Sequence, residues 1–169
     1  MATVRNTVIA DLNFIYELFD QSILYQETKG FPVWRNYDRT AIVNDINSGN
    51  QYKVIVDEEI GIVFSVAYSD KVIWRELDEG NSIYLHRIVV NPAFKGKKLF
   101  GNVLAWSIDH AREKGLASVR MDTWASNPVI INYYMGFGFR FIENYTTPDT
   151  DELPVHNRKL ALTLLEYSL

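Results

Sequence analysis

Residues 82–122 constrain the fold of this chain more than any other segment, because they predict a strand, a crossover helix and a second strand in succession. The run SIYLHRIVV, residues 82–90, has the apolar character of a buried strand. Apolar residues then recur at helical spacing after Phe100 and stop at Gly115, and 117–122 returns to a strand pattern. Such a unit predicts two parallel neighbouring strands, with the connecting loop at the sheet edge where open α/β sheets bind ligands.

The remaining segments predict an α+β order around this unit, with two helices before it and one after it. Helices begin at polar capping residues and follow apolar positions three and four residues apart, whereas strands are rich in Val, Ile, Tyr and Phe. We expect helices over 11–27, 38–48 and 127–136, and strands over 3–9, 51–57, 60–68, from 138 onward and over 158–168.

Composition limits the classes of protein to which this chain can belong. The 169 residues, 47% hydrophobic, suit a single domain over 1–169 with one sizeable core. A net charge of −4 gives no basic surface for nucleic acid, and the absence of cysteine excludes disulfides, thiolate metal sites and a cysteine nucleophile. No apolar run is long enough to cross a bilayer, and residues 1–20 lack a signal layout. We therefore expect no membrane partner, with the cytoplasm as the default location.

The connection between the first strand and the crossover helix, NPAFKGKKLFG, concentrates positive charge. Lys95, Lys97 and Lys98 surround Gly96 just before the helix begins. A helix amino end exposes unpaired N–H groups and carries about half a positive charge, and glycine lets the backbone approach an anion closely. The turn therefore predicts a phosphate site. Its spacing alone fits a solvated, lysine-rich turn that binds nothing equally well.

Three segments resemble the GNAT N-acyltransferase superfamily: LHRIVVNPAFKGKKLFGNVLAW, ASVRMDTWASN and NPVIINYYMGFGFRFIE. The specific part of the resemblance covers residues 83–142, and the order of the earlier and later elements also fits. It implies the α+β GNAT acyl-CoA N-acyltransferase fold, a central mixed, mostly antiparallel sheet that is splayed in the middle and flanked by helices on both faces. It also implies an N-acetyltransferase that moves acetyl from acetyl-CoA to a primary amine by direct attack in a ternary complex.

The resemblance further implies which residues bind coenzyme A. In the family, the loop after the fourth strand reads Gln/Arg-x-x-Gly-x-Gly/Ala and its amides hold the pyrophosphate, but this chain has Lys95, Lys98 and Phe100 at those positions. We expect a modified cradle, provided that the turn keeps negative φ throughout; weaker coenzyme affinity is the alternative. The implied coenzyme contacts are Lys95, Gly96, Lys97, Lys98, Leu99, Phe100 and Gly101 in the loop, the backbone of Ile88, Val89 and Val90 along the pantetheine arm, and Asn127 and Tyr134.

The predicted catalytic acid is Tyr134. Asn127, Tyr134, Gly138 and Phe139 match a second spacing of the family, in which the tyrosine lies near the coenzyme sulfur and protonates the leaving thiolate. From the residues alone, a packed core aromatic is the competing interpretation, because aromatic neighbours surround this tyrosine in the sequence.

The predicted base is His86, because Tyr84 takes the position where many relatives carry a glutamate. Strand alternation puts His86 on the same face as Tyr84, and imidazole can accept a proton near neutral pH; a structural histidine is the alternative. Arg87 is expected to point to the other face and to partner the sheet or a helix. The acids eligible to attract a cationic acceptor, most of them expected to be merely solvated, are Glu27, Glu76, Asp78, Glu79 and Asp122.

The sequence also predicts partners. We expect acetyl-CoA as cosubstrate, a small-molecule or peptide amine as acceptor, and no nucleic acid; the resemblance adds a homodimer as one option. We expect no metal, because His110 and His156 lack a partner at ligand spacing. Two alternatives stay open: a catalytically weak or inactive coenzyme A-binding or sensory domain, and an interaction module that binds no nucleotide.

Overall fold

The computed structural model describes residues 1–169 and contains the predicted elements in the predicted order. The first expected strand ends early, and one short helix, α3, was not predicted. None of the helices combines the length and the apolarity that crossing a bilayer requires. The elements are β1 Thr3–Asn6, α1 Leu12–Thr28, α2 Arg39–Asn47, β2 Gln51–Val56, β3 Glu59–Ala67, α3 Lys71–Trp74, β4 Ser82–Val90, α4 Phe100–Glu113, β5 Ser118–Trp124, α5 Pro128–Met135, β6 Arg140–Thr146 and β7 Ala161–Ser168.

The strands form one mixed sheet in the order β1-β2-β3-β4-β5-β7-β6. All neighbours are antiparallel except β4 and β5, which are parallel and are joined by α4. The predicted strand–helix–strand unit is therefore confirmed, and so is the mixed, mostly antiparallel sheet. Successive side chains of a strand point to opposite faces, and the central strands β3 and β4 are buried on both.

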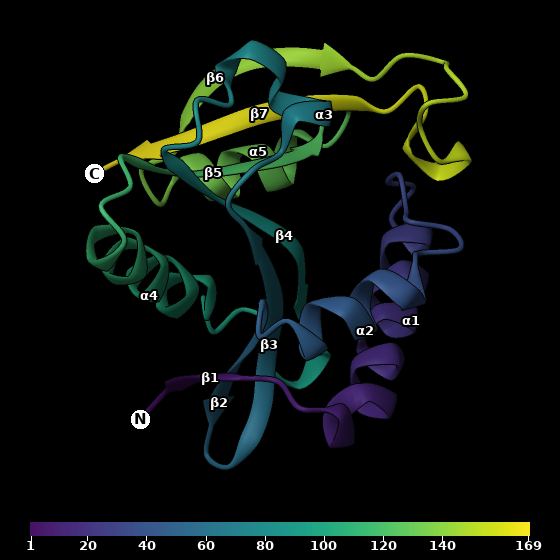
Figure 1. Cartoon of the computed structure of the whole chain (residues 1–169). Helices are drawn as coiled ribbons and strands as arrows, with labels where there is room; N and C mark the ends of the chain where they lie inside the picture. The colour runs from purple at the N-terminus through teal and green to yellow at the C-terminus, as the bar shows by residue number, and fades with distance from the viewer.

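The sheet opens between its two parallel strands. β4 and β5 pair only from Ser82–Ser118 to Leu85–Met121, although β4 continues to Val90 and β5 to Trp124. Figure 1 shows the consequence: β4 crosses the centre of the molecule, and β5, β7 and β6 diverge from the half formed by β1, β2 and β3. The predicted splay in the middle of the sheet is confirmed, and it exposes backbone that a continuous sheet would pair.

Helices cover both faces of the sheet (Figure 1). The main core packs α4 and α5 against one face, with Phe64, Leu85 and Phe100 almost completely buried. On the other face, α1 and α2 bury Ile15 and Ile42, among others, against β3 and β4. Burial of these apolar side chains is the main source of the fold's stability.

Candidate active site at the opening of the sheet

The turn before α4 presents backbone N–H groups that have no acceptor within the protein. The amides of three predicted contacts, Lys95, Lys97 and Gly101, donate to carbonyls of the turn itself. The amides that donate to no backbone or side-chain acceptor are those of Gly96, Lys98, Leu99 and Phe100. Unbonded amides at the start of a 14-residue helix suit an anion such as a diphosphate, so the local structure fits this part of coenzyme A.

The condition attached to the modified cradle, negative φ throughout the turn, is not met. Gly96 has φ of +82° and Lys98 has φ of +53°. Lys98 occupies the position of a family glycine, and its backbone adopts the left-handed conformation that glycine takes most easily. For a residue with a side chain this conformation costs roughly 1–2 kcal/mol, so the turn retains the glycine-like backbone at some cost in stability.

Three side chains of the turn contact aromatic rings of the protein. Phe100 is buried and packs edge-on against Tyr134, with ring centroids 4.8 Å apart, which explains how a bulky residue is tolerated where the family has a small one. The Lys95 ammonium lies 3.5 Å from the ring centroid of Tyr25 on α1, and that of Lys97 lies 4.6 Å from the Phe94 ring centroid. Two of the three lysines therefore rest on aromatic rings of the protein itself.

The second half of β4 has one free backbone edge. Val89 and Val90 pair with Val63 and Ile62 of β3, but nothing pairs with them on the side of β5. Val89 is buried and Ile88 half-buried, so these side chains pack while the backbone stays available. An extended chain can hydrogen-bond to such an edge as an added strand, which is the contact predicted for the pantetheine arm.

An irregularity in β4 lies at Arg87. The pairing with β3 shifts between Val63 and Ser65, and Arg87 has φ of +50°. Its guanidinium donates to Asp45 of α2, with Nη2 2.6 Å from Oδ2, so the predicted helix partner is confirmed. A bulge of this kind bends the strand and re-aims its side chains, so regular alternation ends just after His86.

The predicted acid, Tyr134, lies on α5 with its ring in the main core. Its hydroxyl has no hydrogen-bond partner in the protein, and burial, followed by the nearby Tyr133 and Asp122, raises its pKa. The hydroxyl therefore keeps its proton at neutral pH. Asn127 caps α5, because its Oδ1 accepts a hydrogen bond from Ile130 N at 3.2 Å; of its two predicted roles, capping is observed, and coenzyme binding stays a prediction.

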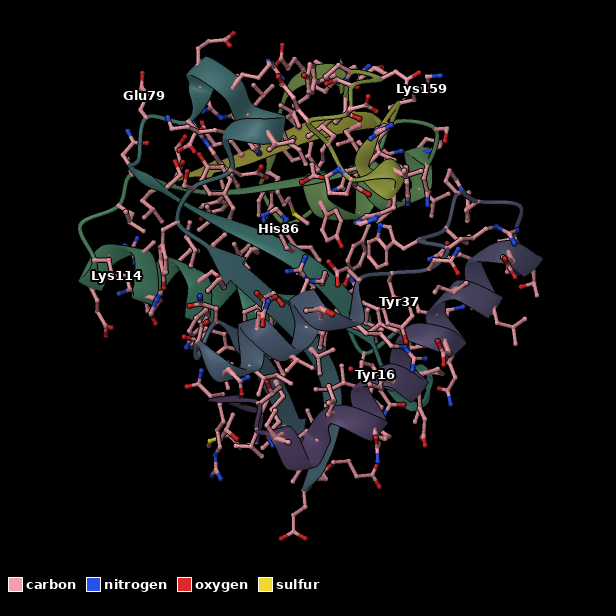
Figure 2. All side chains as sticks on the ribbon, turned by 45° about the vertical axis from the view of Figure 1, so that its right-hand side comes forward. Tyr16, Tyr37, Glu79, His86, Lys114 and Lys159 are labelled. Carbon is pink, nitrogen blue, oxygen red and sulfur yellow. The ribbon has the colours of Figure 1, made fainter.

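His86 lies between two carboxylates at the point where β4 and β5 part. Its Nε2 is 3.4 Å from Oδ2 of Asp70, and its Nδ1 is 4.0 Å from Oδ1 of Asp122. Figure 2 shows His86 in the middle of the molecule, between the two diverging halves of the sheet. Each of the three residues offers a ligand atom, and these atoms lie within 4.8 Å of one another, which makes the group the candidate position for a cation.

Burial shifts the pKa values of this cluster in opposite directions. It raises the pKa of Asp122 to about 7, with the charge of Asp70 adding to the effect, and it raises that of Asp70 to about 6. It lowers the pKa of His86 to about 4. His86 is therefore neutral at pH 7 and weakly basic, whereas Asp122 has a proton affinity matched to neutral pH.

Asp70 is the residue that the sequence analysis missed. It follows β3 and caps α3 by accepting a hydrogen bond from Ile73 N at 3.3 Å. The only signal in the sequence is a helix cap, an aspartate directly before the segment KVIW. Nothing in that local pattern indicates that its second oxygen reaches His86 and the region of Asp122.

The other candidate acids are engaged elsewhere. Although burial opposes it, hydrogen bonds from Ser69, from the Asp70 amide and from Tyr84 lower the pKa of Asp78 to about 2. Tyr84 itself is fully buried, so the position of the family glutamate is structural in this chain. On the surface, Glu27 pairs with Arg35, Glu76 lies beside Arg75, and Glu79 contacts Asn81.

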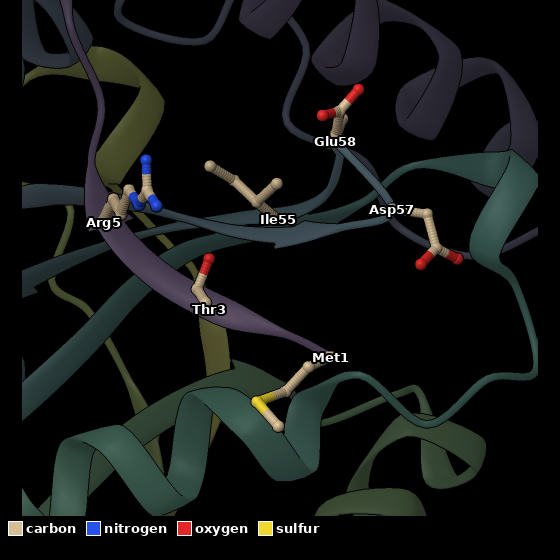
Figure 3. Close-up of a pocket in the computed structure, with 6 residues that line it drawn as sticks. All are labelled: Met1, Thr3, Arg5, Ile55, Asp57 and Glu58. Carbon is tan, nitrogen blue, oxygen red and sulfur yellow. The ribbon is translucent and has the colours of Figure 1, made fainter.

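A hollow at the far edge of the sheet is separate from this site. Figure 3 shows it along β1 and the turn between β2 and β3. In the sheet, β3 separates β1 and β2 from β4. Its lining residues are Met1, Thr3, Arg5, Ile55, Asp57 and Glu58. None of the residues discussed above lines it, so we place the candidate active site at the opening between β4 and β5.

Comparisons with known proteins agree with this architecture. The sequence pattern of the Acetyltransferase (GNAT) family matches residues 15–139. The uncharacterized N-acetyltransferase YesJ of Bacillus subtilis is 24% identical over 143 residues, which cover 80% of this chain and 79% of YesJ.

Solved structures show the same fold over nearly the whole chain. A GNAT-family acetyltransferase of Listeria monocytogenes superposes with a TM-score of 0.77 at 20% identity, covering 99% of this chain and 95% of that one. The Salmonella typhimurium protein yncA, solved with its cofactor acetyl-CoA, superposes with a TM-score of 0.67 at 20% identity, covering 99% and 94%. Because the family pattern spans most of the sequence and the fold agrees throughout, this protein belongs to the GNAT acetyltransferase family.

Proposed function

We propose that this protein is an N-acetyltransferase that moves the acetyl group of acetyl-CoA to a primary amine, by direct attack in a ternary complex. The observation that carries the proposal is the opening between β4 and β5. The unbonded amides of the turn before α4 lie after the end of β4, and the cluster of Asp70, His86 and Asp122 lies where the pairing of the two strands ends. Family membership supports the reaction class, and the absence of cysteine is consistent with transfer without a cysteine-bound intermediate.

Coenzyme binding would use backbone groups more than side chains. The free amides of Gly96, Lys98, Leu99 and Phe100 would hold the diphosphate, with the charge of the turn in support. The unpaired edge of β4 at Ile88, Val89 and Val90 would hold the pantetheine arm. The thioester would then lie within the opening, near the level where the pairing of the two strands ends.

Transfer requires one group that accepts a proton and one that donates a proton. The amine nitrogen attacks the thioester carbonyl carbon and loses a proton to the pair of Asp122 and His86. Asp122 is the stronger base of the two, because burial raises its pKa to about 7 and lowers that of His86 to about 4. The C–S bond breaks, its electron pair stays on sulfur, and sulfur takes the proton of the Tyr134 hydroxyl. Burial raises the pKa of that tyrosine, so its hydroxyl carries a proton at neutral pH.

The test is thiol release from acetyl-CoA with a panel of alkylamines, amino acids and peptides, together with calorimetric titration of acetyl-CoA. We expect binding, and thiol release that depends on the amine. Binding without thiol release from any amine would replace the proposal with a coenzyme-binding domain. A melting temperature that acetyl-CoA leaves unchanged at saturating concentration would reject both.

A further inference from the structure

Three residues that can bind a metal ion meet where β4 and β5 part: Asp70, His86 and Asp122. One ligand atom from each residue lies within 4.8 Å of the others. The three residues come from separate segments, after β3, on β4 and on β5, so no ligand spacing is visible in the sequence. Zinc and similar transition-metal ions accept two carboxylates and an imidazole, whereas magnesium and calcium take oxygen ligands.

The cluster contains a buried carboxylate oxygen without a partner. The Asp70 side chain is 10% exposed, and its Oδ1 accepts a hydrogen bond from the Ile73 amide. Its Oδ2 lies 3.4 Å from His86 Nε2, yet no hydrogen bond reaches it. A buried carboxylate oxygen with neither a donor nor a counter-charge is unfavourable. This position therefore favours a ligand that brings positive charge.

A second buried polar atom beside the cluster also lacks a partner. Ser65 lies opposite His86 in the pairing of β3 with β4, so the two side chains lie on the same face of the sheet. Ser65 is 1% exposed, and its Oγ has no hydrogen-bond partner. A hydroxyl in this place can bond to a water molecule on a metal ion or to one of its ligands. Two unpaired buried polar side chains thus neighbour His86.

No lysine or arginine of the protein neutralises the two carboxylates. Histidine is the only basic side chain that contacts Asp70 or Asp122. The basic residues nearest in the sequence have other partners, Lys71 with the Asp78 carbonyl, Arg87 with Asp45 and Arg120 with Glu166. Positive charge at the cluster must therefore come from a ligand.

We propose that Asp70, His86 and Asp122 form a binding site for one zinc ion, and that bound zinc inhibits acetyl transfer. The three side chains supply three ligands, and water takes the fourth position of a tetrahedral ion. Zinc binding is independent of the proposed function, whereas the inhibition rests on it.

The spacing of the cluster fits a tetrahedral zinc ion. Two ligands that are each about 2.0 Å from such an ion lie about 3.3 Å apart. His86 Nε2 and Asp70 Oδ2 are already 3.4 Å apart. The largest separation in the set is 4.8 Å, so shifts of at most about 1.5 Å bring the third ligand, Asp122, to the same spacing. The hydrogen bond from the Ile73 amide holds the Asp70 carboxylate in orientation.

Inhibition follows because zinc and the proton compete for the same atoms. In the proposed transfer, the amine loses a proton to the pair of Asp122 and His86. Metal ligands must be deprotonated, and a lone pair that is bound to zinc cannot take up a proton. The predicted coenzyme contacts, on the turn before α4 and along the free edge of β4, do not include the three ligands. Zinc should therefore stop transfer while acetyl-CoA stays bound.

Calorimetric titration of zinc into chelator-treated protein tests the site. We expect the wild type to bind one zinc ion per chain, with an affinity at least tenfold lower in Asp70→Asn. Asparagine can still cap α3, so this variant should fold, and its melting temperature checks that. The matched controls are Glu79→Gln and His156→Ala, which remove an exposed carboxylate and an exposed imidazole and should keep the wild-type affinity. Glu79 lies far from His86 (Figure 2).

Thiol release with and without zinc tests the inhibition. The zinc concentration that halves the rate should be at least tenfold higher in Asp70→Asn than in the wild type, and EDTA should restore the rate. The released thiol also binds zinc, but it does so equally in both assays, so the difference between the variants reports the site.

Two results would overturn the zinc site: no zinc binding by the wild type, or binding that Asp70→Asn leaves unchanged. Zinc that binds through Asp70 but leaves the rate unchanged or raises it would overturn the inhibitory role. If no amine releases thiol, the proposed function fails, and the calorimetric comparison of wild type and Asp70→Asn still decides whether the site exists.

Discussion

The two halves of β4 differ in what they are paired with, and the difference separates structure from proposed function. Ser82 to Leu85 pair with β5, and Tyr84 and Leu85 also pair with β3, so that the strand is bonded on both edges there. From His86 to Val90 the strand pairs with β3 alone, and a bulge interrupts it at Arg87. A fully paired, buried strand contributes stability, whereas unpaired backbone beside titratable side chains is available to a ligand.

Two aspartates repeat this contrast. Asp78 accepts a hydrogen bond from the hydroxyl of Tyr84, in the paired half of β4, and its pKa is lowered to about 2. Asp122 lies on β5 just beyond Met121, the last residue that pairs with β4, and its pKa is raised to about 7. The same side chain is held ionised where donors surround it and is poised to take up a proton where they are missing.

The largest expected effect is a difference in how much a substitution in each half of β4 lowers the free energy of unfolding. Leu85→Ala should lower the free energy of unfolding by about 2–5 kcal/mol, because Leu85 is buried in the main core. Val90→Ala, at an exposed position of the unpaired half, should cost less than about 1 kcal/mol. Urea denaturation of both variants measures this, and similar losses would show that the second half is as structural as the first.

Tyr134→Phe tests whether the opening is where transfer occurs. Loss of the acid should lower turnover by about a hundredfold, while the affinity for acetyl-CoA stays within about twofold. Tyr133→Phe is the control, since the neighbouring ring is more exposed and was not predicted to act. Thiol-release kinetics and calorimetry give the two numbers. Unchanged turnover in Tyr134→Phe would leave Tyr134 a packing residue.

Asp122 and Asp78 should change the free energy of unfolding in opposite directions as pH rises. Asp122 has a folded pKa of about 7, above its ordinary 3.8, so the folded state binds more protons between those values and stability falls as pH rises. From about pH 4.5 to pH 8, Asp122→Asn should therefore gain at least about 1.4 kcal/mol relative to the wild type.

Asp78 is the matched comparison, because folding lowers its pKa instead of raising it. Its folded pKa of about 2 lies below 3.8, so its contribution is present above pH 4 and is lost as pH falls toward 2. Asp78→Asn should therefore be destabilised by nearly the same amount at both pH values. Urea denaturation at each pH provides the comparison; a gain with pH in Asp78→Asn, or none in Asp122→Asn, would contradict the contrast.

The smallest effect concerns the turn that follows the unpaired half. Lys98→Gly and Lys98→Ala remove the same charge, but only glycine relieves the backbone at φ of +53°. The glycine variant should be more stable than the alanine variant by up to about 1 kcal/mol, because greater unfolded-state entropy offsets part of the relief. Thermal unfolding compares them, and equal melting temperatures would mean that the turn is unstrained.

Local patterns were sufficient to predict the order of the elements. The apolar run of β4, the helical spacing of α4 and the glycine at its end predicted a parallel strand pair, and β4 has the predicted bounds. The lysine-rich turn at the start of α4 was found in the same way, because helix ends have sequence signals of their own. Tyr134 was identified through a resemblance, and His86 through strand alternation from Tyr84, which takes the place of the family glutamate. Their catalytic roles stay predictions.

What the sequence determined by itself is therefore the longer helices and the strands, their order and the turn that follows β4, since each depends on neighbours within a few residues. The tertiary structure alone decided that Asp70 lies beside His86, that Asp122 faces them, and that Lys98 has a left-handed backbone. Those features depend on how strands distant in sequence diverge, and side-chain periodicity contains no information about the residues that meet across such an opening.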